Sequence, residues 1–330
     1  MRNLAKLQRI CYLTLCCYVV VKVFKDFQYI LASQGRHDRT GAGKSRSLDS
    51  LNVGVNSTKT YLLALFTTLP SRDQNDNITR AVIRNWASLA SAIQPYLFYL
   101  PGQDDVVNLA VSRGWRTLPV PKKNKYSVPY LKDMYRVMAD SCSSAFIGYS
   151  NGDILYDSGL QETLKTVEGS LDVLDPVLVI GRRTTVDASR WDMISGSVDD
   201  VSRLARSGVL DRADAEDYFL VTRRFPWRLF PNLVVGRKGY DNFIVARSID
   251  NNISVVDATE SITSVHLRRT SRLGSRTKAD ILFNKYKLIN KFDYMKAMTI
   301  SAPYYTSTNR GKVVLSKRKY DKRFKDVRWS

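Results

Sequence analysis

The sequence predicts an α/β domain with a mostly parallel sheet between residues 60 and 267. Apolar runs of strand length alternate there with segments whose apolar residues recur at helical spacing. The hydrophobic content of 44% is that of a packed globule, and 330 residues suffice for one large domain or two small ones. Such alternation is typical of parallel strands joined by right-handed helical crossovers.

The first half of this domain shows the alternation most clearly. The apolar run at 61–69 is closed by Pro70, as expected for a central parallel strand. Beyond Asp153 the pattern loosens into short strands separated by polar segments rather than by regular helices. The other expected elements are strands at 95–100, 115–120, 145–150, 176–181, 218–221, 232–236 and 253–256, and helices around 82–93, 104–113 and 131–138.

Charge is distributed unevenly along the chain. The net charge is +20, but the basic excess lies in residues 1–59 and 268–330, so residues 60–267 are close to neutral. A nucleic-acid-binding core carries its own basic patch, so this distribution argues against nucleic acid as a partner. We read 268–330 as a basic C-terminal segment, either solvated or in contact with an acidic partner.

The N-terminus has the pattern of a membrane anchor. Residues 1–9 are basic, the following run from Ile10 to Val21 is apolar, and residues 32–59 are polar and rich in glycine and serine. We predict a cytoplasmic tail at 1–9, a signal-anchor at 10–31 and a flexible stem at 32–59. The alternative is a cleaved signal peptide. The anchor predicts a single-pass type II protein of the Golgi or ER membrane with a lumenal body.

Three N-glycosylation sequons agree with a lumenal body. They begin at Asn56, Asn77 and Asn252. Their presence predicts a glycoprotein.

The segment 145–156 carries the clearest chemical signal. An apolar run ends in Asn151-Gly152-Asp153 and then resumes, which predicts a buried strand that delivers one carboxylate to its carboxyl end. Mg²⁺ and Mn²⁺ bind one or two protein carboxylates together with substrate phosphates. The alternative is an Asn-Gly turn in which Asp153 only follows the turn.

Five segments taken together resemble glycosyltransferases of the GT-A type, which have the nucleotide-diphospho-sugar transferase fold with its Rossmann-like sheet. The resemblance covers about residues 60–267. It implies a nucleotide-sugar donor, a glycan acceptor and a divalent metal, Mn²⁺ or Mg²⁺, on the diphosphate. The segments are 150–154 (SNGDI), 179–183 (VIGRR), 216–219 (EDYF), 235–243 (VGRKGYDNF) and 256–266 (VDAT to TSVH).

The chain also departs from this family. The usual D-x-D motif is Asn151-Gly152-Asp153 here, and two tryptophans are replaced by Tyr240 and Phe243. The first change leaves one certain carboxylate for a metal.

The resemblance and the residue types together assign candidate roles. Asp153 and His266 are the candidate metal ligands, although a lone histidine after a strand is often structural. Asp241 is the candidate general base, and its alternative role is a helix N-cap. Asp217 is the rival base or an acceptor-binding acid, and its alternative is a solvated acid at the start of a strand.

Candidate donor-binding residues lie at strand ends and on one helix. The two arginines could bind phosphate, or one of them could pair with Asp187. For the two helical residues the alternative is a solvated helix face. The candidates are Thr67, Thr68, Asp133, Arg136, Asn151, Arg182 and Arg183.

These observations predict a metal-assisted, inverting glycosyltransferase that moves a sugar from a nucleotide-sugar to a glycan or glycoconjugate. The alternative is a catalytically silent, membrane-tethered glycan-binding protein on the same fold.

Overall fold

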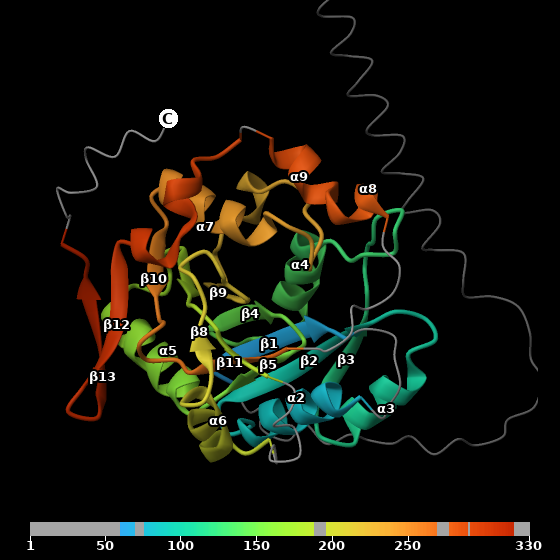
Figure 1. Ribbon diagram of the computed structural model, residues 1–330, viewed down its shortest axis with the longest axis horizontal. Coiled ribbons are helices and arrows are strands. Elements are labelled where there is room, and N and C mark those ends of the chain that lie inside the picture. The colour runs from blue at the N-terminus through green and yellow to red at the C-terminus, as the bar shows by residue number, and fades with distance from the viewer. Residues whose placement is uncertain (1–59, 70–75, 188–195, 269–276, 290, 320–330) are drawn as a thin grey trace, which may run out of the picture. The chain divides into compact units, whose positions relative to one another are not determined.

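The computed structural model describes residues 60–69, 76–187, 196–268, 277–289 and 291–319 (Figure 1). No helix in these ranges is long and apolar enough to cross a membrane. This finding corrects the predicted localisation as a single-pass type II protein of the Golgi or ER membrane. The predicted tail, signal-anchor, stem and first sequon, Asn56, lie outside the described residues.

A nine-stranded sheet forms the centre of the described part, with strand order β13-β12-β10-β6-β9-β4-β1-β2-β3. All strands run in one direction except β9 and β13, so the predicted mostly parallel α/β sheet is confirmed. The strands are β1 (Leu63–Thr68), β2 (Ile93–Tyr99), β3 (Arg116–Pro119), β4 (Phe146–Ser150), β6 (Val177–Ile180), β9 (Tyr218–Thr222), β10 (Ser254–Asp257), β12 (Tyr304–Asn309) and β13 (Lys312–Lys317).

Helices cover both faces of this sheet. In Figure 1, α2, α3 and α6 lie below the sheet and α4 and α7 lie above it. Each face has its own buried apolar cluster, and Trp86 stacks on Trp115 at 5.1 Å in one of them. The helices of the first cluster are α2 (Asn77–Ser88), α3 (Asp104–Val111), α5 (Gly159–Ser170) and α6 (Val198–Ala205), and those of the second are α4 (Leu131–Ser141), α7 (Tyr240–Asp250) and α9 (Phe283–Leu288).

A smaller sheet lies beside the ends of β4 and β6. Its order is β5-β11-β7-β8, comprising β5 (Ile154–Tyr156), β11 (Ser264–Leu267), β7 (Thr184–Val186) and β8 (Val209–Leu210). His266 pairs with Ile154 on one side and with Thr185 on the other. The small sheet therefore brings His266 next to the turn that follows β4.

The antiparallel strand β9 determines which residues meet at the carboxyl ends. Ser150 at the end of β4 pairs with Tyr218 at the start of β9, and the backbone N–H of Asn151 donates to the carbonyl of Asp217 at 2.9 Å. The carboxyl end of β4 and the amino end of β9 are thus adjacent. This register places Asp217 beside the Asn151-Gly152-Asp153 turn.

The second half of the domain differs from the expectation. Regular helices α5, α6 and α7 separate its strands, and 232–236 forms no strand, with a single bridge between Val234 and Tyr130. The backbone N–H and C=O of Val234 bind the side chain of Asn284 instead, at 3.0 and 2.8 Å. The chain after residue 267 also adds β12 and β13 to the edge of the main sheet.

Candidate functional site

A cleft of about 300 Å³ lies at the carboxyl ends of β1, β2, β3 and β4. Asp153 lines the cleft just after β4, and the lining residues Phe98, Leu100 and Val120, in or just after β2 and β3, are apolar. Ligands of open α/β sheets bind at this edge of the sheet. The lining comprises Thr68, Leu69, Phe98, Leu100, Gln103, Val120, Ser127, Val128, Pro129, Tyr149, Asn151, Gly152, Asp153, Val235, Gly236 and Arg237.

The backbone at Asn151-Gly152 is not a hairpin turn of the Asn-Gly type. That turn needs positive φ at both residues, and neither residue has it. A Cβ on Gly152 would lie 2.6 Å from Leu69 Cδ2 and 3.0 Å from the carbonyl oxygen of Thr68. Gly152 thus lets the β4–β5 connection pass closely over the end of β1. Gly152 and Asp153 still lie in a turn, although not of the type I′ form, so the turn interpretation of Asp153 stands beside the metal-ligand interpretation.

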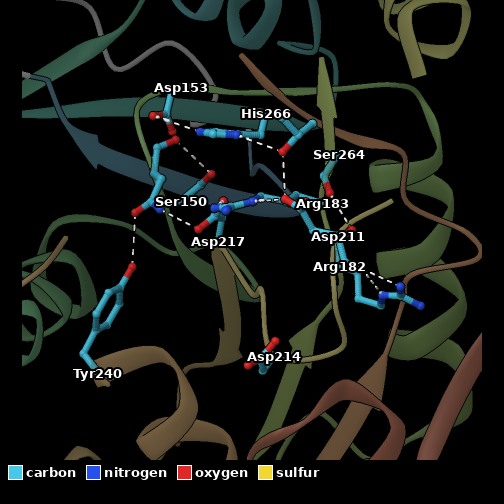
Figure 2. Close-up of polar contacts among 12 residues, drawn as sticks. Ser150, Asp153, Arg182, Arg183, Asp211, Asp214, Asp217, Tyr240, Ser264 and His266 are labelled. Carbon is cyan, nitrogen blue, oxygen red and sulfur yellow. Dashed lines mark hydrogen bonds and ion pairs between the residues drawn. The ribbon is translucent and has the colours of Figure 1, made fainter. Parts of the chain in front are cut away.

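The carboxylate of Asp153 faces His266 (Figure 2). Its Oδ2 lies 3.5 Å from His266 Nε2, and its Oδ1 is buried without a hydrogen-bond partner. A distance of 3.5 Å is too long for a good hydrogen bond between these groups. The two side chains converge without satisfying each other.

A chain of hydrogen bonds behind His266 fixes its tautomer. The Thr185 hydroxyl donates to Asp211 Oδ2 at 2.7 Å, because an ionised carboxylate only accepts. The same hydroxyl oxygen, 3.1 Å from His266 Nδ1, must then accept from Nδ1–H. In the neutral imidazole the Nε2 lone pair therefore points at Asp153. Figure 2 shows this line from Asp153 through His266 to Asp211.

Asp217 is held on both carboxylate oxygens. Asn151 Nδ2 donates to Oδ1 at 2.7 Å, and the Arg183 guanidinium forms an ion pair with Oδ2. Burial raises the pKa of Asp217, and the charge of Arg183 opposes that rise. Arg183 also pairs with Asp211 at 2.6 Å. Asp217 is buried, so the solvated-acid alternative is wrong.

Asn151 has no free carbonyl for a ligand. Its Oδ1 accepts from the hydroxyls of Tyr149 and Tyr240, at 3.0 and 3.1 Å. Because both tyrosines donate to Oδ1, the amide Nδ2 must point at Asp217. The structure therefore places Asn151 as a residue that positions Asp217.

Asp241 lies in the first turn of α7. Gly239, with φ 91°, is the N-cap of this helix, so the N-cap alternative for Asp241 is wrong. Oδ1 of Asp241 accepts from the backbone N–H of Asn242 at 3.0 Å. Burial, together with the charge of Asp217, raises the pKa of Asp241 to about 7.

A second carboxyl accompanies Asp241. Glu216 is fully buried, its Oε1 has no partner, and Asn242 Nδ2 lies 3.4 Å from its Oε2. Burial and the nearby Asp241 raise its pKa well above the usual range. Two carboxyls that disfavour each other's charge are thus adjacent to the buried Asp217.

The other sequence candidates are dispersed. Thr68 lines the cleft, whereas the hydroxyl of the fully buried Thr67 lies 3.3 Å from the Thr68 carbonyl. Asp133 and Arg136, on α4, are not among the lining residues.

Arg182 lies apart from the cleft. Its guanidinium donates to the Asp211 carbonyl at 2.7 Å, and it lines a separate cavity of about 220 Å³ with Asp257, Thr259 and Arg318. Neither arginine pairs with Asp187, whose ion-pair partner is Arg268 at 3.9 Å. The Asp187 alternative is therefore wrong.

Two sequons lie in the described part. Asn77 and Asn252 are both exposed, at the start of α2 and just before β10. Their glycosylation stays a prediction.

Sequence reasoning missed Thr185, Asp211 and Glu216. The segment 179–185 (VIGRRTT) could have indicated Thr185, which lies two residues after Arg183 and pairs with His266 in the small sheet. Glu216 begins the 216–219 (EDYF) segment but carries no separate signal, and no local pattern distinguishes Asp211.

Comparisons with known proteins concern the fold. A scan against protein-family models finds no match, and a search of curated proteins finds no similar sequence. A cytidylyltransferase from Leptospira borgpetersenii is 11% identical, with 73% of this chain and 92% of that chain covered and a TM-score of 0.39. The inositol-1-phosphate CTP transferase from T. maritima is 14% identical, with 70% and 96% covered and a TM-score of 0.35.

Glucosyl-3-phosphoglycerate synthase from Mycobacterium tuberculosis, in complex with Mn²⁺, uridine diphosphate and glucosyl-3-phosphoglycerate, is 10% identical, with 79% and 88% covered and a TM-score of 0.36. These neighbours are nucleotide-diphospho-sugar transferase-like, in agreement with the resemblance noted from the sequence. Because their TM-scores lie below 0.5, the function proposed for this chain rests on its own residues.

Proposed function

We propose that this protein is a glycosyltransferase that binds a nucleotide-sugar with a divalent cation at Asp153 and transfers the sugar to a hydroxyl of a glycan or glycoconjugate. One observation carries the proposal. The carboxylate of Asp153, which lines the cleft, faces the Nε2 lone pair of His266, which lies behind the lining residues, and no donor of the described part satisfies Asp153 Oδ1.

The residues present fit a metal that is bound mainly by its substrate. Within the described ranges, no group of three or more His, Cys, Asp or Glu side chains could hold an ion. Mn²⁺ and Mg²⁺ need no such group when phosphates supply further oxygens. Two ligands of an octahedral ion, each about 2.1 Å from it, lie about 3 Å apart. The 3.5 Å between Asp153 and His266 is close to that spacing.

The cleft also suits the remainder of a nucleotide-sugar. The apolar side chains of Phe98, Leu100 and Val120 line the cleft and would contact the base. The diphosphate would then lie next to Asp153. A bound divalent cation would supply charge neutralisation of the diphosphate leaving group.

Removal of the proton from the acceptor hydroxyl would fall to the carboxyls near α7. Asp241, with a pKa of about 7, can accept the proton of the acceptor hydroxyl at neutral pH. Asp217 cannot do so readily because Asn151 and Arg183 occupy both of its oxygens. We therefore assign the role of general base to Asp241, which supports an inverting reaction. Asp217 would instead hold the charged guanidinium of Arg183 in place through their ion pair.

The test is stabilisation by ligands, measured as the melting temperature of the whole chain. UDP, GDP, CDP and their sugar conjugates are added with and without MnCl₂. A ligand at 100 times its dissociation constant stabilises by about 2.7 kcal/mol, which corresponds to a shift of about 5 °C in a domain of this size. We expect such a shift with Mn²⁺ for at least one nucleotide.

Two variants sharpen this test. Asp153→Asn should abolish the Mn²⁺-dependent part of the shift, while the matched control Asp187→Asn, at an exposed acid, should retain it. Equal shifts in wild type and Asp153→Asn would show that Asp153 is not a ligand. Binding of a nucleotide-sugar without any turnover would favour the catalytically silent, glycan-binding alternative.

A further inference from the structure

The segment that begins at residue 277 is amphipathic. Helix α8 (Lys278–Ile281) continues almost directly into α9. The residues of the two helices that face the domain are Asp280, Asn284 and Leu288, which are spaced four apart. Asp280 pairs with Arg237 at 2.8 Å, Asn284 binds the backbone of Val234, and Leu288 is buried in the apolar cluster. One face of the segment is thus fixed to the domain.

The opposite face is both apolar and basic. Ile281, Tyr286 and Ile289 are 38%, 58% and 56% exposed, which is high for large apolar side chains. The lysines Lys278, Lys285 and Lys291 are exposed among them. Asp280 is the only acid in the sequence from 277 to 291, and it points inward to Arg237. No acid in this segment offsets the outward lysines.

The neighbouring loop enlarges this surface. Tyr126 and Tyr130 contact the ring of Phe283 at centroid distances of 6.3 and 6.4 Å. Lys287 lies over Phe283 at 4.6 Å and over Tyr130 at 5.5 Å. The same loop carries the exposed lysines Lys122, Lys123 and Lys125. We call this combined area the α8–α9 surface.

We propose that the α8–α9 surface binds the face of a lipid bilayer that contains anionic headgroups. Lysines near such a bilayer are attracted by its negative surface potential, and the apolar side chains between them enter the headgroup boundary. A hydrated polyanion would bind the lysines but gain nothing from Ile281 and Ile289, whose side chains form no hydrogen bonds. The exposed isoleucines therefore favour a bilayer over a soluble polyanion.

The surface is also connected to the cleft. Val235, Gly236 and Arg237 line the cleft, and the Arg237 side chain and backbone are held by Asp280 and Asn284. Docking through α8–α9 would place the mouth of the cleft near the bilayer. The inference does not depend on the reaction proposed above, because it concerns only the outward residues of this segment.

The test is co-sedimentation of the full chain with phosphatidylcholine vesicles, with and without phosphatidylserine. Wild type should prefer the vesicles that contain phosphatidylserine. Lys285→Gln/Lys291→Gln should weaken binding to those vesicles about 30-fold, from the attraction per lysine near an anionic surface. Tyr286→Ser/Ile289→Ser should weaken it about tenfold or more without any change of charge.

The matched control is Lys312→Gln/Val314→Ser on β13, which removes an exposed lysine and an apolar side chain (41% exposed) elsewhere. It should bind as wild type does. Equal binding to both kinds of vesicle, or equal losses in the control, would overturn the proposal. Normal vesicle binding by Tyr286→Ser/Ile289→Ser would overturn it too, and lysine-dependent binding of heparin would then identify a polyanion surface.

Discussion

The substitution Asp241→Asn should lower turnover and raise stability at the same time. The carboxyl of Asp241 has a pKa of about 7 in the folded protein, against 3.8 in an ordinary setting, because burial and the charge of Asp217 disfavour its ionised form. Asparagine keeps the size of the side chain and its place in the first turn of α7, but carries no charge at any pH.

The magnitudes follow from that pKa. About one tenth of Asp241 is ionised at pH 6 and about nine tenths at pH 8, so wild-type turnover should rise nearly tenfold between them. Loss of the base in Asp241→Asn should reduce turnover by about 10²–10⁴-fold and remove this pH dependence. The assay is release of nucleoside diphosphate from the donor that the binding experiment selects, at saturating acceptor.

The stability effect has the opposite sign. Because the folded-state pKa lies above the unfolded value, folding favours the protonated carboxyl, and this contribution is lost as the pH rises from about 4 to about 7. At pH 8 the ionised wild-type group costs about 2–4 kcal/mol. Asp241→Asn avoids that cost, so its melting temperature should exceed wild type at pH 8 and equal it near pH 4.

The control is Asp250→Asn, at the other end of α7, where the acid is exposed and pairs with Lys296 at 2.7 Å. It should leave turnover unchanged. Asp241→Asn with more than a third of wild-type turnover would refute the base assignment. A melting temperature below wild type at pH 8 would refute the buried-charge argument, independently of activity.

Three further predictions concern the neighbours of this group. Thr185→Val removes the acceptor that fixes the tautomer of His266, so Mn²⁺ affinity, measured by titration, should fall about 10–100-fold with little change in melting temperature. Arg183→Ala leaves the buried Asp217 without its cation and should destabilise by about 3–5 kcal/mol in urea denaturation, part of which Asp217→Asn in the same chain should restore. Gly152→Ala forces a Cβ against the end of β1 and should cost about 1–3 kcal/mol while weakening nucleotide binding in the thermal assay. Unchanged metal affinity, unchanged stability or unchanged nucleotide binding, respectively, would contradict these three expectations.

Local patterns predicted the parts of the fold that local interactions determine. The strands β1, β2 and β3 and the helix α4 lie within a few residues of their expected positions, because each has its own period and ends. The family resemblance assigned Asp153, Arg183 and Asp217 to one candidate site, and in the structure Asp217 lies beside Asn151 and pairs with Arg183. Register explains it, since antiparallel β9 brings Asp217 back to the end of β4.

Long-range contacts determined what the sequence could not show. Val234 has the apolar neighbours of a strand residue, yet its backbone groups bind Asn284, which lies 50 residues away. Asp211 lies in a polar stretch without periodicity, and only the pairing of β7 with β8 and β11 brings it to Arg183 and Thr185. Such positions have no local signal, because their partners are chosen by the topology of the small sheet.

The charge balance of the site is the strongest physical reason to expect a cation there. Arg183 is shared between Asp211 and Asp217, so its single charge is already committed. Protonation near neutral pH relieves Asp241. Asp153 has neither arrangement, since the group that faces it is the Nε2 lone pair that the Thr185–Asp211 chain directs toward it. A carboxylate and an imidazole lone pair directed at one point repel each other unless a proton or a metal cation lies between them, and a cation that arrives with a diphosphate would supply such a charge.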